Sequence, residues 1–423
     1  MTQTPAATGV EEAARRAKEA SRAVACLGHP TKDAVLRDLA ARIAASEAVI
    51  LEANARDMQA ASGAGLPDAK LRRLEITNAG LAQMAEGLEQ IAAMPDPIGQ
   101  RTRDVTVPSG LRVTKQRTPL GVVAMIYEAR PGVTIDAFAL CFKAGNACLL
   151  KGGREATESN RALHALAVAA LEANGCPSSA IELITTSDRD ELRGMLTLTE
   201  SIDLVIPRGG ETLIRFVHEH ARVPTVQHFH GVCHVYVDRD ADLDTAIEIV
   251  ATGKTSAPAT CNTTECVLVH RDIARDFLPK LAERANSDGF AIRAEPRALE
   301  AVGPGLGLQA ATDTDFGREY LDLILAARVV DSLDDAVAHI ARFGSDHTDV
   351  IVSRDEAAQR AFTTRVTSSC VLVNASSRFN DGFQLGLGAE IGISTSRIHA
   401  YGPMGLEELT TERYVVIGNG QTR

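Results

Sequence analysis

Several features that would assign this 423-residue chain to a broad class are missing from it. No apolar run approaches the ~20 residues of a membrane-spanning helix, and the N-terminus lacks the basic-then-apolar layout of a signal peptide. The chain has no block of Lys and Arg, and 44 basic against 55 acidic residues give a net charge of -11. This balance argues against a nucleic acid or an anionic membrane as the main partner. We expect a cytoplasmic protein that acts on a small molecule.

A disulfide framework and a metal site are also not indicated. The eight cysteines include no C-x-x-C pair, and several, such as Cys148, lie in apolar segments, which favours reduced thiols. Five histidines lie close together in the sequence, at positions 218, 220, 228, 230 and 234. No cysteine or carboxylate pattern completes a ligand set with them, so we predict no metal.

Two common nucleotide-binding motifs are absent. Gly253-Lys254-Thr255 resembles the end of a P-loop, but residue 248 is Glu where that motif has Gly. No G-x-G-x-x-G opens a helix after a strand, although the fold inferred below normally binds a nucleotide. If this chain binds a nucleotide, the site must therefore use residues other than these two motifs.

The sequence does contain a regular alternation of helical and apolar segments. Residues 11–60 and 69–93 carry apolar positions at helical spacing. Short apolar runs at 122–126, 147–150, 181–184 and 204–206 then alternate with helical stretches, and the alternation restarts after 237. This pattern is typical of parallel strands covered on both faces. We predict an α/β fold with two doubly wound Rossmann-like domains, an irregular stretch at 287–317, and a β-hairpin around the Pro-Ser-Gly turn at 108–110.

Cys261 is the cysteine best suited to be a nucleophile. Residues 254–265 around it are small and polar, with backbone N–H groups able to hold an oxyanion. The other seven cysteines lie in apolar strands, on helices or at the edges of elements, where a small buried residue is the usual role. The context alone leaves both a catalytic thiol and an ordinary loop cysteine open.

A series of motifs resembles the gamma-glutamyl phosphate reductases, or glutamate-5-semialdehyde dehydrogenases, of the aldehyde dehydrogenase superfamily. They run through most of the chain in the family's order and spacing, from Thr-Pro-Leu-Gly-Val-Val at 118–123 onwards. The others lie at 127–131, 143–147, 151–153, 207–210, 261–263, 331–336, 373–379, 386–390 and 399–406.

The resemblance implies NADPH-dependent reduction of L-glutamyl 5-phosphate to L-glutamate 5-semialdehyde with release of phosphate, a step of proline biosynthesis. Cys261 would be the nucleophile, forming a thioester that a hydride reduces. The superfamily's nucleotide fold works without the usual glycine motif. On this basis we predict an NADP-binding domain at 1–104 and 117–234, a catalytic domain at 235–400, and an oligomerisation element at 105–116 and 401–423.

The same resemblance places the cofactor against one set of residues: Lys151, Arg154, Pro207, Arg208, Gly209, Gly210 and Glu319. Superfamily members that use NAD often carry an acid at the position of Arg154. A guanidinium there can pair with a 2′-phosphate, which favours NADPH, although a solvated arginine is the alternative. Glu319 matches the glutamate that holds the nicotinamide ribose, even though Phe316 replaces a common Trp.

An anionic substrate needs basic and hydrogen-bonding groups near the thiol. Arg130 and Arg378 are our basic candidates, and each could alternatively form a structural ion pair. Asn262, Asn374 and Ser376 are the candidates for hydrogen bonds.

Residues 227–233 decide between a reductase and a hydrolytic aldehyde dehydrogenase. They contain no carboxylate where hydrolytic members carry a general-base Glu, so the thioester should persist until hydride or phosphate reacts. His228 or His230 could replace that base. Two alternative functions therefore remain: another acylating aldehyde dehydrogenase, or a hydrolytic one. A non-catalytic homologue is a third alternative, but such a protein would be expected to have lost Cys261 or Glu319.

The resemblance also implies partners. The hairpin and the strand at 414–417 would form a sheet shared between subunits, which predicts a homodimer or a dimer of dimers. A separate glutamate 5-kinase would supply the acyl phosphate, with transient contact between the two enzymes as a hypothesis.

Overall fold

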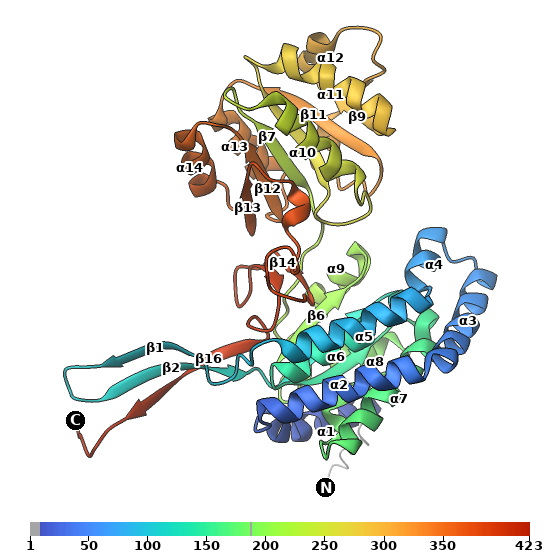
Figure 1. Cartoon of the computed structure of the whole chain (residues 1–423), viewed down its shortest axis with the longest axis vertical. Coiled ribbons are helices and arrows are strands. Elements are labelled where there is room, and N and C mark those ends of the chain that lie inside the picture. Colours follow the sequence, from blue (N-terminus) through green and yellow to red (C-terminus); the bar gives the residue numbers. More distant parts are fainter. Residues whose placement is uncertain (1–8, 187) are drawn as a thin grey trace. The chain divides into compact units, whose positions relative to one another are not determined.

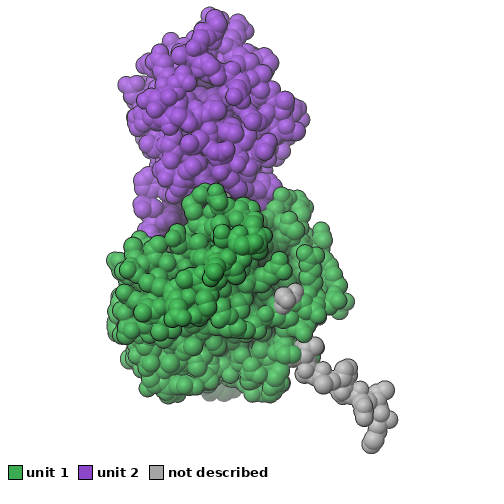
Figure 2. Space-filling view, turned by 90° about the vertical axis from the view of Figure 1, so that its right-hand side faces the viewer, with its two compact units in different colours: residues 1–227, 387–392, 404–423 green, residues 228–386, 393–403 purple. Residues whose placement is uncertain are grey.

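The computed structural model describes residues 9–186 and 188–423, which form two compact units (Figures 1 and 2). Unit 1 contains the chain up to residue 227 together with 387–392 and 404–423, and unit 2 contains 228–386 and 393–403. The chain thus passes into unit 2 at 227/228, seven residues before the predicted boundary at 234/235. Among the described residues, no helix has the length and apolarity needed to cross a membrane.

Unit 1 begins with five helices, as the helical periodicity predicts. They are α1 (Gly9–Val24), α2 (His29–Ala45), α3 (Glu47–Gly63), α4 (Asp68–Leu74) and α5 (Asn78–Ala93). The apolar positions face inward: in α2, for example, Val35, Leu36, Leu39 and Ile43 are buried.

A four-stranded parallel sheet in the order β5-β4-β3-β6 forms the centre of unit 1. Its strands are β3 (Val122–Tyr127), β4 (Ala147–Lys151), β5 (Ile181–Leu183) and β6 (Leu204–Arg208). The connecting helices are α6 (Val133–Lys143), α7 (Thr157–Ala173), α8 (Arg189–Met195) and α9 (Glu211–His220). Every residue of β3 is buried, because helices cover both faces of the sheet.

A small antiparallel sheet in the order β1-β2-β16 also belongs to unit 1. It joins the predicted hairpin, β1 (Arg101–Thr106) and β2 (Arg112–Pro119), to the C-terminal strand β16 (Thr410–Ile417) (Figure 1). Tyr414, Val416 and Ile417 are exposed on β16. The hairpin is confirmed, whereas the role of this sheet in oligomerisation stays a prediction.

Unit 2 is built on a seven-stranded parallel sheet in the order β10-β9-β11-β8-β7-β12-β13. The strands are β7 (Cys233–Val237), β8 (Thr264–His270), β9 (Ala291–Ala294), β10 (Gln309–Ala310), β11 (Ile324–Val330), β12 (Thr348–Val352) and β13 (Cys370–Val373). The helices are α10 (Leu243–Thr255), α11 (Ala274–Asp288), α12 (Pro296–Val302), α13 (Leu333–Phe343) and α14 (Glu356–Arg365). Two short strands, β14 (Gly392–Ser394) and β15 (Gly402–Met404), form a separate two-stranded sheet at the points where the chain passes between the units.

The sheet of unit 2 separates two apolar cores. Val235 and Val237 of β7 pack into one core with α10 and α11, while Tyr236 between them packs into the other with α13 and α14. Successive side chains of a strand point to opposite faces, so one strand contributes to both cores. The predicted doubly wound α/β fold is therefore confirmed.

The prediction of an irregular stretch at 287–317 is wrong. The segment contains β9, α12 and β10. Its Pro and Gly residues limit short elements instead of preventing them: Pro296 lies in the first turn of α12, and Gly303, at a φ of 75°, ends that helix.

Candidate active site

Cys261 lies in the loop between α10 and β8, and its side chain is half-buried. A thiol must ionise in order to attack, and burial opposes this for several of the other cysteines. Burial raises the pKa of Cys141 to about 12 and that of Cys370 to about 11. The polar loop and partial exposure of Cys261 are compatible with a reactive thiol, and its role as the nucleophile stays a prediction.

Hydrogen bonds hold the Cys261 loop in place from inside and outside. Within it, the hydroxyl of Thr260 donates to the carbonyl of Ala257 at 2.8 Å. Outside it, Ser377 Oγ donates to the carbonyl of Asn262 at 2.7 Å, and the Asn262 amide donates to the carbonyl of Asn380 at 3.0 Å. Neighbours both before and after Cys261 are thus anchored, which fixes the position of the thiol.

Two of the predicted substrate-binding residues of unit 2, Asn262 and Arg378, take part in this anchoring, whereas Ser376 and Asn374 bond residues outside the loop. Arg378 donates to Thr260 Oγ1 at 2.8 Å and to Asn262 Oδ1, while its buried Nε has no partner among the described residues. Ser376 Oγ accepts from the backbone N–H of Arg378 at 3.4 Å. The amide of Asn374 bonds the backbone N–H and carbonyl of Ser353, both at 3.0 Å. A direct role in substrate binding stays a prediction for all of them, Asn262 included.

Two histidines lie beside Cys261. One ring nitrogen of His228, one of His347 and Sγ of Cys261 all lie within 4.8 Å of one another. His228 is half-buried and its Nδ1 donates to the carbonyl of Ile393 at 2.8 Å, so the neutral ring carries its lone pair on Nε2. His347 is fully buried, and burial lowers its pKa to about 3.

Sequence reasoning named His228 but missed His347, because only the sheet topology joins them. β8, β7 and β12 are parallel neighbours, with Cys233 opposite Thr264 and His234 opposite Asp349. The residues that precede neighbouring parallel strands meet at one edge of the sheet. Cys261, His228 and His347 precede β8, β7 and β12, respectively.

Gly231 allows the segment before β7 to approach the Cys261 loop closely. A Cβ atom added at Gly231 would lie 2.0 Å from the carbonyl oxygen of Cys261. The N–H of Gly231 also donates to Glu319 Oε1 at 3.1 Å. One glycine therefore links the backbone of the candidate nucleophile to the carboxylate predicted to hold the cofactor ribose.

We predict that Gly231→Ala lowers kcat by about 100-fold, because the added methyl group forces the Cys261 backbone away by roughly 1 Å. Steady-state kinetics of the purified variant would measure this. Gly194→Ala is the matched control, since nothing lies within 4 Å of a Cβ at that helical position. A kcat for Gly231→Ala within about twofold of wild type would contradict the proposed fit.

The predicted cofactor residues of unit 1 gather at the carboxyl edge of its sheet. Lys151 and Arg208 end β4 and β6 on either side of β3, opposite Ile126 and Tyr127. Pro207 precedes Arg208 within β6, and Arg154 is exposed three residues after β4. In open α/β sheets, nucleotides bind at this edge.

The link from β6 to α9 has little free space. A Cβ at Gly209 would lie 2.7 Å from the Leu213 side chain and 3.1 Å from that of Glu128. The N–H of Gly210 donates to Glu128 at 3.4 Å, so a carboxylate bonds the amino end of α9. Arg130, the remaining substrate candidate, is exposed beyond β3 in unit 1.

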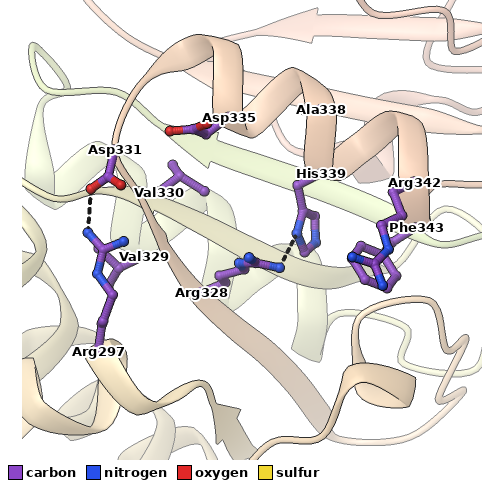
Figure 3. A pocket seen from close by; sticks show the side chains of 10 residues that line it. All are labelled: Arg297, Arg328, Val329, Val330, Asp331, Asp335, Ala338, His339, Arg342 and Phe343. Carbon is purple, nitrogen blue, oxygen red and sulfur yellow. Dashed lines mark hydrogen bonds and ion pairs between the residues drawn. The ribbon is translucent and has the colours of Figure 1, made fainter.

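A pocket of about 290 Å³ lies elsewhere in unit 2, between β11 and α13 (Figure 3). Arg297 pairs with Asp331 there at 2.6 Å, and Arg328 Nη1 donates to Nδ1 of His339 at 3.2 Å. None of its lining residues is a cysteine, and Cys261, His228 and His347 are not among them. The pocket is therefore separate from the nucleophile loop.

Comparison with known proteins gives a consistent result. Residues 2–293 match the model of the aldehyde dehydrogenase family. The chain is 50% identical to a gamma-glutamyl phosphate reductase of Salinibacter ruber, over 99% of this chain and 96% of that one. It is 49% identical to one of Nitratidesulfovibrio vulgaris, over 99% of both.

The solved structures agree. The crystal structure of gamma-glutamyl phosphate reductase from Thermotoga maritima superimposes with a TM-score of 0.96 at 37% identity, covering 98% of this chain and 100% of that one. The chain therefore belongs to the aldehyde dehydrogenase family and, within it, to the gamma-glutamyl phosphate reductases.

Proposed function

We propose that this chain reduces L-glutamyl 5-phosphate to L-glutamate 5-semialdehyde with NADPH and releases phosphate, a step of proline biosynthesis. The observation that carries the proposal is the anchored, half-buried thiol of Cys261 in a chain that is 50% identical over nearly its whole length to a gamma-glutamyl phosphate reductase. Membership of the family supports the proposed type of reaction. The structure of the loop supports the assignment of Cys261 as the residue that performs it.

In this reaction the Cys261 thiolate attacks the acyl carbon of the substrate, and phosphate leaves with the bonding electrons. The acyl group stays on Sγ as a thioester. His228, with a ring nitrogen within 4.8 Å of Sγ, can accept the thiol proton. The anchors on Asn262 and Thr260 hold the loop while the tetrahedral centre forms and collapses.

Resolution of the thioester separates this function from a hydrolytic one. Residues 227–233 supply no carboxylate to activate water, which supports transfer of hydride or phosphate to the thioester. The position of His228 beside Cys261 also favours one second candidate, a hydrolytic aldehyde dehydrogenase with His228 as the base. Dependence on phosphate distinguishes the two.

The residues of unit 1 fit a nicotinamide cofactor through their charge and position. Aldehyde dehydrogenases use such cofactors, which supply a hydride when bound. Lys151 and Arg208 place cations at the carboxyl edge of the sheet, and burial lowers the pKa of Lys151. Lys151, Arg154 and Arg208 would hold the phosphates, and the family resemblance assigns the nicotinamide ribose to Glu319.

Arg154 should set the preference for NADPH. We predict that Arg154→Glu lowers the ratio of kcat/KM for NADPH to that for NADH by about 10- to 100-fold, because a carboxylate repels the 2′-phosphate that a guanidinium attracts. Arg193→Glu, at another exposed arginine of unit 1, is the control. An unchanged ratio would show that Arg154 is simply a solvated residue.

The sheet β1-β2-β16 is our candidate for the subunit contact. β16 exposes Tyr414, Val416 and Ile417, and Val416 is 53% exposed. We predict that Val416→Lys shifts the protein from a homodimer, or a dimer of dimers, to smaller species in sedimentation velocity. Val49→Lys, at a 62% exposed position of α3, should leave the assembly unchanged. A monomeric wild type, or an intact Val416→Lys oligomer, would contradict this interface.

The reverse reaction tests the function, because the aldehyde is easier to handle than the acyl phosphate. NADP+ reduction by glutamate 5-semialdehyde should require inorganic phosphate. Reduction without phosphate would mean that water resolves the thioester and would replace our proposal by the hydrolytic candidate. A separate kinase would supply the acyl phosphate in the cell, where the cytoplasmic location and any contact between the two enzymes stay predictions.

A further inference from the structure

Cys261, His228 and His347 together carry the donor atoms of a transition-metal site. A thiolate with two imidazoles is a donor set that Zn²⁺ prefers. Tetrahedral zinc, with bonds of about 2.3 Å to S and 2.0 Å to N, places its ligand atoms roughly 3.3 to 3.6 Å apart. The three ligand atoms here lie within 4.8 Å of one another, and rotation of the half-buried Cys261 side chain can close the difference.

His347 supplies an independent sign of a ligand. Its Nε2 is buried and has no hydrogen-bond partner among the described residues. Its Nδ1 bonds Thr348 Oγ1 at 2.7 Å, and that oxygen also accepts from the Asn380 amide at 2.7 Å. A fixed ring with an unpartnered buried nitrogen is unusual, and a coordinated cation would satisfy it.

The surroundings of both rings resemble those of metal-binding histidines. Such rings usually bond the second nitrogen to a backbone carbonyl or a polar side chain, which fixes the tautomer that coordinates. His228 does so through Nδ1 and Ile393, and His347 through Nδ1 and Thr348. In His228 the hydrogen on Nδ1 leaves the lone pair on Nε2, and in His347 Nε2 is the nitrogen without a hydrogen-bond partner among the described residues.

A second cluster of similar composition in unit 2 differs at one ring: His234 there also has a buried Nε2 without a hydrogen-bond partner among the described residues, but His339 is in a tautomer that does not suit coordination. His234, Cys266 and His339 also bring their ligand atoms within 4.8 Å, and all three are buried. Arg328 donates to Nδ1 of His339, so the neutral His339 ring carries its hydrogen on Nε2, 3.9 Å from Cys266 Sγ. That nitrogen has no lone pair for a metal.

We propose that Cys261, His228 and His347 bind Zn²⁺ and that the metal reversibly blocks the nucleophile. The zinc ion takes the place of the thiol proton, which is released to solvent, and a water fills the fourth position. No electron is transferred. While the metal is bound, the sulfur electron pair that would attack the acyl carbon is held in the Zn–S bond. The metal site stands on geometry alone, whereas the effect on turnover rests on the proposed function.

Binding of Co²⁺ to this site can be measured by its absorption spectrum, which does not depend on enzyme activity. The full-length, reduced, metal-free protein would be titrated anaerobically with Co²⁺. We expect one equivalent to give a thiolate-to-cobalt charge-transfer band and the visible bands of tetrahedral cobalt, with release of about one proton. Cys261→Ser should lose the charge-transfer band. His228→Ala and His347→Ala should each weaken binding by more than about 100-fold, whereas His230→Ala, in the same segment, should keep it.

Alkylation gives a second readout in the wild type, which avoids variants that fail to fold. Zn²⁺ should slow iodoacetamide modification of Cys261 at least about tenfold, measured on its peptide, and leave the exposed Cys26 unaffected. Chelation should restore the rate. Absence of the cobalt band, its persistence in Cys261→Ser, or wild-type affinity in either histidine variant would overturn the proposal.

The proposed function can fail separately. A wild type that shows the cobalt band but no phosphate-dependent turnover would refute the reductase and leave the metal site in place. An active wild type whose turnover is unaffected by saturating Zn²⁺ would refute the block.

Discussion

Replacing Cys261 with alanine is expected to lower phosphate-dependent NADP+ reduction at least about 1,000-fold, because the reaction loses the atom that carries the acyl group. The loop should survive the change, since its anchors come from neighbouring residues: Thr260 bonds Ala257, and Asn262 bonds Asn380 and Ser377. The loss should therefore appear in kcat with an unchanged melting temperature. Initial rates with glutamate 5-semialdehyde and phosphate would measure it.

Cys370→Ala is the matched control for this experiment. Cys370 is also half-buried, but it begins β13 and burial raises its pKa to about 11. Its removal should leave the rate within about twofold of wild type. More than about a tenth of wild-type activity in Cys261→Ala would show that the thioester route is wrong.

Replacing Lys254 with methionine should destabilise the protein by about 3 to 5 kcal/mol, because it leaves a buried charge without its partner. Lys254 lies in the last turn of α10 and Glu265 lies in β8, so the pair joins the two elements that flank the Cys261 loop. Both side chains are fully buried, and Lys254 Nζ lies 2.7 Å from Glu265 Oε2 and 3.1 Å from the carbonyl of Asp322. Calorimetric melting would measure the loss.

The destabilisation should depend on pH with a defined sign. Burial raises the pKa of Glu265 to about 7 even with Lys254 present, and loss of the cation raises it further. A carboxyl group whose folded pKa is raised costs stability when it ionises. The loss in Lys254→Met should therefore be larger near pH 8 than near pH 5.5.

Two further variants test whether the pair is responsible. Lys254→Met combined with Glu265→Leu removes both charges and should recover more than about half of the loss. Lys280→Met, at an exposed lysine of α11, should change the melting temperature little. Equal destabilisation by Lys254→Met and Lys280→Met would contradict the argument.

Part of this candidate active site could be predicted from the sequence, because neighbouring residues in the chain are enough to indicate it. The small polar residues around Cys261 cannot form a buried strand, so a loop cysteine is predictable from 254–265 alone. Lys151 and Arg208 each follow an apolar run, and residues that end neighbouring parallel strands share an edge. Once the strands are predicted to be parallel, Lys151 and Arg208 are expected at the same edge of the sheet.

Lys254 has a structural role that the sequence did not indicate. The sequence excluded Gly253-Lys254-Thr255 as a P-loop, because Glu stands at position 248. It gave no sign that Lys254 pairs with Glu265, eleven residues later on a different element. A helix end and a strand position become neighbours only when α10 packs beside β8.

By itself, the sequence determined the doubly wound α/β fold, the hairpin and the family, because hydrophobic period, turn residues and motif order are properties of neighbouring residues. Tertiary structure alone decided that His347 lies 4.8 Å or less from the ligand atoms of His228 and Cys261, and that Gly231 must lack a side chain. Strand order in the sheet, β8-β7-β12, brings together segments up to 119 residues apart, from 228 to 347. Such contacts leave no periodic trace in the chain, because the backbone hydrogen bonds that create them are the same for every side chain.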